Sequence, residues 1–220
     1  MGKLQRLLSL SWTQFVYYNF LCRNIERDKG KYLLPRRGSR IELNKHAKII
    51  LHGHLCLNEN KYPHSHAECF LRLRDGAVMD VKGRVTLMYN GTVEVHENAS
   101  LQIGSCTVQS GAVIICAYKM TIGQGCLFSR MCYMSDSDHH RITDEGGKIA
   151  NYPRETVIGD NVWVGVKATV MKGAKIKDGC AIGVNSIVGG RVKEHLLVMN
   201  EPARPFSEVH WSAEGFGDFK

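Results

Sequence analysis

Residues 135–157 contain the side chains best suited to chemistry. This polar segment holds two adjacent histidines, His139 and His140, and several acids, among them Asp136 and Asp138. A neutral imidazole, with a reference pKa of about 6.5, can take the proton of a hydroxyl as the oxygen attacks a carbonyl. The segment therefore indicates a general base, and the residue types alone leave open which histidine it is.

A six-residue repeat follows this segment and must help to position it. Between residues 158 and 193, every sixth residue is aliphatic, and the residue four places later is small or β-branched. The aliphatic set is Ile158, Val164, Val170, Ile176, Ile182 and Val188; the second set is Val162, Ala168, Ala174, Cys180, Ser186 and Val192. A period of six fits neither a simple helix nor an alternating strand, but it fits short strands joined by tight turns, three to a coil. We therefore expect a solenoid whose aliphatic residues stack inside a narrow prism.

A weaker form of the same pattern precedes the polar segment. A step of six links Val95, Leu101, Thr107 and Val113, and after a slip across residues 118–121 it resumes at Ile122, Phe128 and Met134, with Cys126 and Cys132 as small residues. Residues 41–92 are β-rich and glycine-punctuated, and we expect them to form early, irregular coils. The polar segment is thus an excursion from a regular scaffold, and such an excursion is a natural place for function because its ends are held rigidly.

The repeat and its flanking motifs resemble the left-handed parallel β-helix acyltransferases of the hexapeptide-repeat family. Residues 136–142, 157–165, 183–188 and 201–204 carry the resemblance to the subgroup that O-acetylates sugars, which includes maltose, galactoside, capsule and lipopolysaccharide acetyltransferases. The resemblance covers residues 95–206. It implies an all-β fold, a left-handed parallel β-helix with a short N-terminal helix. It also implies acetyl-CoA as co-substrate and a homotrimer with active sites between neighbours.

The resemblance also implies roles for individual residues. His140 matches the catalytic histidine of the family, and His139 takes that place if the motif is aligned one residue earlier. Asp138 could hold the other ring nitrogen of the base. The acetyl group would pass directly to the acceptor, without an acyl-enzyme. The residues expected to bind CoA are Trp163, Gly165, Ala168, Gly183, Ser186, Arg191, Lys193 and Arg204.

Two departures from the family pattern affect the CoA assignment. Gly189 and Gly190 stand where relatives usually have Thr-Lys, so Arg191 or Lys193 is expected to replace the missing lysine at the CoA phosphates. Asn200-Glu201 stands before Pro202 where relatives usually have Gly-Asn.

The positive charge of the chain is concentrated at its N-terminal end. The 29 Lys and Arg residues outnumber the 21 Asp and Glu residues by eight, and seven of those excess charges fall within residues 1–40. Leu4, Leu7, Leu8, Ser11, Phe15, Tyr18 and Cys22 share one helical face there. We expect a basic amphipathic segment over 1–40, the β-helix domain over 41–206 with its catalytic loop at 135–157, and a tail over 207–220. The helix would lie either on an anionic membrane or against the protein's own core or a neighbouring subunit.

Composition excludes several other classes of protein. The eight cysteines form no C-x-x-C pair and no dense disulfide pattern, so reduced thiols in a cytoplasmic protein are expected. The sequence shows no apolar run long enough to span a bilayer and no signal-peptide pattern, so we expect at most peripheral contact, through residues 1–40, with the inner face of a membrane. No nucleic-acid-binding motif accompanies the positive charge, so no nucleic-acid partner is expected.

The predicted activity is acetyl-CoA-dependent O-acetylation of a sugar hydroxyl in a cell-surface polysaccharide or its precursor. One alternative is an amino-sugar N-acetyltransferase, because an amine acceptor also has to lose a proton. Another is a non-catalytic β-helix that acts as an assembly module. A third is a zinc enzyme of the γ-carbonic-anhydrase kind, drawing ligands from His52, His54, His64, His66 and the 139–140 pair; we expect no metal. The sequence leaves the acceptor sugar and its hydroxyl open.

Overall fold

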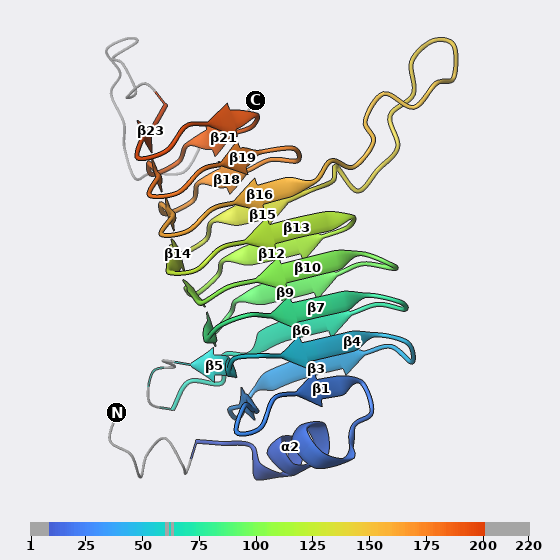
Figure 1. The fold of residues 1–220 in the computed structure, drawn as a ribbon, viewed down its shortest axis with the longest axis vertical. Coiled ribbons are helices and arrows are strands. Elements are labelled where there is room, and N and C mark those ends of the chain that lie inside the picture. Colours follow the sequence, from blue (N-terminus) through green and yellow to red (C-terminus); the bar gives the residue numbers. More distant parts are fainter. Residues whose placement is uncertain (1–8, 60–61, 63, 201–220) are drawn as a thin grey trace, which may run out of the picture.

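Short strands wind around a three-sided coil in the computed structural model, which describes residues 9–59, 62 and 64–200. Each strand pairs in parallel with the equivalent strand one turn earlier and one turn later, so the described residues form three parallel sheets (Figure 1). The expected left-handed parallel β-helix with a short N-terminal helix is confirmed.

The three sheets run the length of the coil. The first contains β1 (Ile25–Arg27), β4 (Lys48–Leu51), β7 (Val78–Val81), β10 (Ser100–Ile103), β13 (Lys119–Ile122), β16 (Thr156–Ile158), β19 (Lys175–Ile176) and β22 (Arg191–Val192). The second contains β2 (Leu33–Pro35), β5 (Leu55–Glu59), β8 (Val85–Met88), β11 (Cys106–Val108), β14 (Cys126–Phe128), β17 (Trp163–Val164), β20 (Ala181–Ile182) and β23 (Leu197–Val198). The third contains β3 (Ser39–Leu43), β6 (Cys69–Leu73), β9 (Thr92–Val95), β12 (Val113–Cys116), β15 (Tyr133–Ser135), β18 (Thr169–Val170) and β21 (Ile187–Val188).

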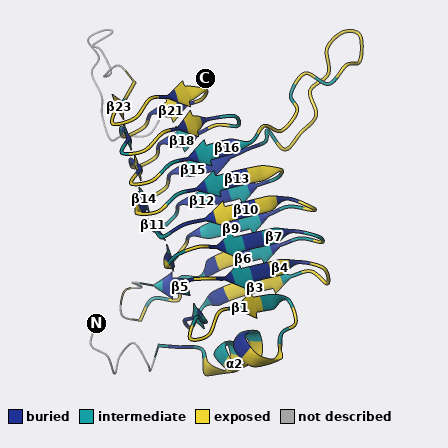
Figure 2. Cartoon of the chain, viewed as in Figure 1, coloured by how far each residue is buried: buried dark blue, intermediate teal, exposed yellow. Residues whose placement is uncertain are grey.

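The core is the stack of aliphatic side chains that the repeat predicts. All six aliphatic repeat residues between Ile158 and Val188 are buried, and so are the six small or β-branched residues that follow each of them. Figure 2 shows buried residues alternating with partly buried or exposed ones along the strands, as expected when successive side chains point into and out of the prism. The repeat pattern therefore identified the inside of the C-terminal coils correctly.

The predicted phase of the earlier repeat is wrong over one stretch. Val95 and Leu101 are buried, but Thr107 and Val113 are only partly buried, and their neighbours Val108 and Ile114 fill the core. The reason is coil length. The coil that leads from Thr92 to its partner Val113 is half a repeat longer than the coil that leads from Val157 to its partner Lys175. The pattern recovers at Ile122, Phe128 and Met134, which are all buried.

The polar segment leaves the coil between β15 and β16. Tyr133 pairs with Thr169, so this turn contains twice as many residues as the regular turn from Val157 to Lys175. The extra chain projects from the side of the coil as a long hairpin-like excursion (Figure 1), closed near its tip by an antiparallel bridge between Thr143 and Ile149. The catalytic loop predicted at 135–157 thus coincides with the largest departure from the solenoid.

Among the described residues, only part of the 1–40 segment is helical. An α-helix, α2 (Trp12–Val16), continues into one π-helical turn, η1 (Tyr17–Leu21), at the end of the coil (Figure 1). Leu4, Leu7 and Leu8 lie outside the described residues. Strand pairing already begins at Ile25, which pairs with Ile49, so the later part of the basic segment belongs to the β-helix.

All eight cysteines are free thiols, and seven of them are buried. Cys126 and Cys132 occupy the inside of the coil, as the small positions of the repeat predict. Burial raises the pKa of the Cys69 thiol to about 11 and that of the Cys132 thiol to about 12. These thiols therefore stay protonated and unreactive near neutral pH.

Candidate active site

The excursion is anchored to the coil by a buried carboxylate. Asp136 is fully buried, and its carboxylate accepts hydrogen bonds from the backbone N–H groups of Ala117 (2.7 Å) and Tyr118 (3.0 Å). These two N–H groups lie at the slip in the repeat, just before β13 begins. A buried carboxylate is costly unless it is hydrogen-bonded. Asp136 therefore fixes the point at which the loop leaves β15.

His139 is held against the outer face of the coil. Its backbone has a φ of 63°, a left-handed conformation that turns the chain sharply. Its Nε2 lies 3.1 Å from the Tyr133 hydroxyl and 3.1 Å from the Ser135 hydroxyl. The Ser135 hydroxyl itself donates to the carbonyl of Ser137 (2.9 Å), so its oxygen is available to accept a hydrogen bond from the ring. One nitrogen of His139 is therefore engaged by the scaffold.

A second histidine extends this polar cluster along the sheet. The ring centroids of His96 and His139 are 5.5 Å apart, and His96 Nε2 lies 3.6 Å from Glu94 Oε1. Partial burial is the main cause that lowers the pKa of His96 below its ordinary value, although Glu94 opposes the shift. His96 is therefore predominantly neutral near pH 7.

His140 is held by its backbone rather than by its ring. Its N–H donates to the carbonyl of Asp138 (2.7 Å), and its carbonyl accepts from the Asn151 side-chain amide (2.7 Å). Its side chain is exposed at a cavity of about 280 Å³, which is lined by Ser137, His139, His140, Arg141, Ile149, Asn151, Tyr152 and Pro153. No ring hydrogen bond of His140 occurs within the part of the chain that the structure describes.

Asp138 does not hold a histidine ring within the described part of this chain. Its carboxylate accepts from the Lys172 ammonium and from the Asn151 amide (3.0 Å). These hydrogen bonds, that of Lys172 first, lower the pKa of Asp138 below its ordinary value. The side chain turns toward Lys172 because a charge-assisted hydrogen bond is stronger than one to a neutral ring. Asp138 and Lys172 thus form a latch between the loop and the residues after β18.

A second cavity lies beside this latch. It has a volume of about 210 Å³ and is lined by Tyr133, Ser135, Ser137, Asp138, His139, Thr169, Val170, Met171 and Lys172. Ser137 and His139 line both cavities, so His139 stands in the wall between them. The arrangement offers two adjoining openings, one beside the coil and one beneath the loop, with a histidine facing each.

The residues predicted to bind CoA differ in burial and in the sheet they occupy. Ala168 and Ser186 are fully buried, so their side chains fill corners of the coil. A Cβ on Gly165 would lie 2.7 Å from the Ile182 carbonyl oxygen, so this glycine is required by the close approach of two coils. Gly183 is similarly restricted, because a Cβ there would lie 2.8 Å from the Cβ of Met199.

The exposed members of the predicted CoA set lie on different faces. Trp163 is 48% exposed on β17 of the second sheet, and its indole N–H donates to Ser129 Oγ (2.9 Å). Arg191, on β22 of the first sheet, and Lys193 are both exposed. Arg204 lies outside the described residues. Among the described members of the predicted set, Trp163, Arg191 and Lys193 thus present exposed side chains.

The described residues contain no group of three or more His, Cys, Asp or Glu side chains arranged to hold a metal ion. His52 is instead paired with Asp28 (3.0 Å), and His54 Nδ1 accepts from the backbone N–H of Tyr32 (3.2 Å). In the same ranges, no helix is long and apolar enough to cross a bilayer.

Several residues of this site were not predicted from the sequence. Tyr133 and Ser135 point outward from β15 on either side of Met134, which the repeat does place inside, so alternation could have found them. Lys172, Asn151 and His96 had no comparable signal, because their positions depend on how separate coils stack and on the path of the loop.

Comparisons with known proteins find acetyltransferases among the sequence relatives of this chain. A Mycobacterium tuberculosis protein named "Probable acetyltransferase" is 30% identical over 131 residues, which cover 56% of this chain and 42% of that protein. An Escherichia coli protein named for O-acetyl transfer in lipopolysaccharide biosynthesis is 25% identical over 138 residues, 59% of this chain and 64% of that protein. The chain thus spans less than two thirds of the length of these curated relatives.

A solved structure shares the fold over most of the chain. The crystal structure of the polysialic acid O-acetyltransferase OatWY has a TM-score of 0.60 and 20% sequence identity, covering 87% of this chain and 88% of that one. No protein-family model matches the chain. The chain is therefore related in sequence to acetyltransferases and shares its fold with a sugar O-acetyltransferase.

Proposed function

We propose that this chain is an acetyl-CoA-dependent O-acetyltransferase that acts on a sugar hydroxyl of a cell-surface polysaccharide or its precursor. The observation that carries the proposal is the pair of histidines at two adjoining cavities, at the root of the one long excursion among the described coils. The names of the sequence relatives support acyl transfer, and the polysaccharide names among them support a glycan acceptor.

In this proposal, His140 is the general base. A base needs a lone pair free to accept the proton. Neither ring nitrogen of His140 has a hydrogen-bond partner among the described residues, whereas Nε2 of His139 is held by Tyr133 and Ser135, which leaves only Nδ1 of that ring to accept a proton. The imidazole of His140 takes the hydroxyl proton as the sugar oxygen attacks the thioester carbonyl, a contribution of roughly 10²–10⁴-fold to the rate. His139 then forms the wall of the site, and Asp138 positions the loop through Lys172.

Acetyl-CoA supplies the acetyl group as an activated thioester, and transfer is direct. Trp163, Arg191 and Lys193 are the predicted CoA residues whose side chains are exposed enough to contact it. They lie on the first and second sheets, whereas Tyr133 and Ser135 belong to the third. A homotrimer, in which a neighbouring copy completes each site, would reconcile this separation, and we include it in the proposal.

Contact with a membrane surface is the remaining part of the proposal. Asn19 ties the helical segment to β2 through two hydrogen bonds with the backbone of Leu33 (2.8 and 2.9 Å), so one face packs on the coil. Five large apolar side chains are left 47–67% exposed: Trp12, Val16, Tyr17, Phe20 and Leu21. Exposed basic residues such as Arg23 and Lys29 lie close by in the sequence. This combination suits an anionic lipid surface, and we place the protein at the cytoplasmic face of the membrane.

The experiment that tests the activity is an acceptor screen with the purified full-length protein. Acetyl-CoA consumption is measured against sugars, nucleotide sugars and polysaccharides, and each product is treated with mild alkali. We expect a product whose acetyl group is released by alkali, because an ester is cleaved under conditions that leave an amide intact. An alkali-stable product would instead indicate an amino-sugar N-acetyltransferase, and the absence of any transfer would favour an assembly module.

A further inference from the structure

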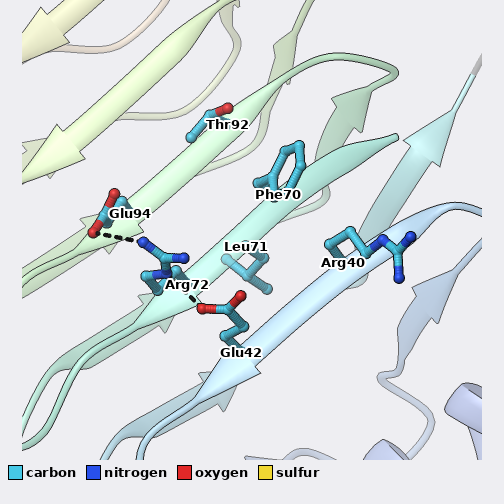
Figure 3. Close-up of a pocket in the computed structure, with 7 residues that line it drawn as sticks. All are labelled: Arg40, Glu42, Phe70, Leu71, Arg72, Thr92 and Glu94. Atoms are coloured by element: carbon cyan, nitrogen blue, oxygen red, sulfur yellow. Dashed lines mark hydrogen bonds and ion pairs between the residues drawn. The ribbon is translucent and has the colours of Figure 1, made fainter. Parts of the chain in front are cut away.

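A charged groove with an aromatic floor lies on the same sheet as the candidate active site. We call it the Phe70 groove (Figure 3); it has a volume of about 220 Å³ and is lined by Arg40, Glu42, Phe70, Leu71, Arg72, Thr92 and Glu94. These residues come from β3, β6 and β9 of the third sheet. The proposed mechanism uses none of them.

Phe70 is the unusual residue of this groove. Cys69, Leu71 and Leu73 of β6 point into the core, so Phe70 and Arg72 point outward. The ring of Phe70 is 45% exposed in the middle of a sheet face that is otherwise lined by polar and charged side chains. A flat apolar ring surrounded by hydrogen-bonding groups is suited to a ligand with both apolar C–H faces and polar edges.

The charged groups around the ring are balanced and already fixed. Arg72 Nε donates to Glu42 (2.6 Å), and Arg72 Nη1 lies 3.7 Å from Glu94. Arg40 pairs with Glu68 beside the groove (2.5 Å). The two arginines and two glutamates that line the groove therefore cancel in charge. They present preorganised donors and acceptors without a net field to attract an anion.

The groove lies on the same sheet as the candidate active site, a few strands away. Glu94 lines it and approaches His96 (3.6 Å), whose ring in turn lies 5.5 Å from that of His139. On the third sheet β9 and β12 separate β6, which carries Phe70, from β15. Three inter-strand steps correspond to about 14 Å. A molecule bound at both places has to be longer than a single sugar.

We propose that the Phe70 groove is a distal acceptor subsite for an extended, uncharged glycan chain. One sugar ring stacks on Phe70 and hydrogen-bonds to the paired Arg and Glu side chains, while a unit further along the chain presents its hydroxyl at the histidines. This inference rests on the proposed function and narrows it. The acceptor is then an oligosaccharide or polysaccharide rather than a monosaccharide.

The test compares a long and a short acceptor with the Phe70→Ala variant. The probes are the polysaccharide found in the acceptor screen and its single repeating unit, and the control is Leu197→Ala, an exposed apolar side chain on the second sheet. We expect Phe70→Ala to raise KM for the polymer about tenfold, as for the loss of one well-packed aromatic contact. The KM for acetyl-CoA should stay unchanged, and Leu197→Ala should match the wild type. Thermal unfolding checks that both variants are folded.

Three results would overturn the inference while leaving acetyl transfer intact. The first is a polymer KM for Phe70→Ala within twofold of the wild type. The second is a wild-type protein that uses the single repeating unit as efficiently as the polymer. The third is a polymer KM that rises steeply with salt, which would indicate a polyanionic acceptor instead. A wild-type protein that acetylates no sugar at all would contradict the proposed function itself.

Discussion

At the scale of single residues, the site depends on side chains that hold the loop as much as on those that face the cavities. Asp136 anchors the beginning of the excursion in the coil, and the Asp138–Lys172 latch ties it to the next coil. The histidines lie directly after these two acids. A small displacement of the loop would therefore move the proposed base relative to both cavities.

Breaking the latch should lower activity without unfolding the coil. We expect Lys172→Met to reduce kcat by about 10- to 100-fold, since a misplacement near 1 Å can cost that much. Lys172→Arg, which keeps the positive charge, should retain more activity. Steady-state kinetics and thermal unfolding of both variants check this. Full activity in Lys172→Met would show that the latch does not position the loop.

The latch also predicts the pH range over which Asp138 titrates. Lys172 and Asn151 lower the pKa of Asp138 in the folded protein. The ionised carboxylate of Asp138 therefore stabilises the fold at pH values above the ordinary Asp pKa of about 3.9. That contribution is lost only as the pH falls through the lower folded value. Carboxyl NMR titration should find the Asp138 pKa below the ordinary range, and Lys172→Met should raise it toward 3.9. An unchanged pKa in the variant would contradict the assignment.

At the scale of structural elements, close contacts between successive coils limit which residues can occupy the corners. A Cβ on Gly123 would lie 2.6 Å from the backbone of Gly159 in the next coil, whereas a Cβ on Gly146 in the excursion would meet only the Asp144 carboxylate at 3.4 Å. Both glycines lie in turns, but only Gly123 is packed against another stretch of backbone. Alanine substitutions at Gly123 and Gly146 can therefore be compared to measure the effect of the contact between coils.

Gly123→Ala should destabilise the fold, and Gly146→Ala should not. Forcing the backbones of two coils apart should cost about 1–3 kcal/mol in the free energy of unfolding. The change at Gly146 should fall within about 0.5 kcal/mol of zero, as for most surface substitutions. Urea denaturation followed by circular dichroism measures both. Equal effects at the two positions would contradict the coil-to-coil packing described above.

The sequence predicted the elements better than it predicted the site. Strict spacing over residues 158–188 identified which side chains fill the core, because a coil made of three whole repeats keeps its phase from one turn to the next. The last coil is two residues shorter, so Val192 pairs with Ile176 and fills a strand position of the core. Thr107 and Val113 were misplaced because the earlier coils are longer than three whole repeats, and the extra residues change the phase without any obvious marker. Lys172 and His96 were missed because stacking brings them to the loop from separate coils, a contact that local spacing does not encode.

At the scale of the whole molecule, the N-terminal end differs from the body in both charge and exposed apolar surface. The helical segment lies at one end of the coil, and the excursion leaves the side of the coil nearer the other end (Figure 1). Deleting residues 1–40 would remove β1 and β2 and expose the core, so that truncation is a poor test of the role of this end. Substitutions on the exposed face are more informative.

Membrane contact should depend on the exposed aromatic side chains. We expect the double variant Trp12→Ser, Phe20→Ser to lose most of its binding to vesicles that contain anionic phospholipid, because it removes two large apolar groups from the lipid-facing side. The double variant Tyr118→Ser, Met131→Ser alters two exposed side chains outside the helical segment and serves as the control. Co-sedimentation at low and high salt measures the binding. Equal sedimentation of the wild type and both variants would remove the membrane from the proposal.

The most direct test of the whole account is the rate of acetyl transfer to the screened acceptor by His140→Ala and His139→Ala. We predict that His140→Ala lowers kcat by roughly 10²-fold or more, because the general base is lost. His139→Ala should lower it less, because that ring forms the wall of the site. Full activity in His140→Ala together with loss in His139→Ala would transfer the role of the base to His139. Full activity in both variants would contradict a histidine base in this loop.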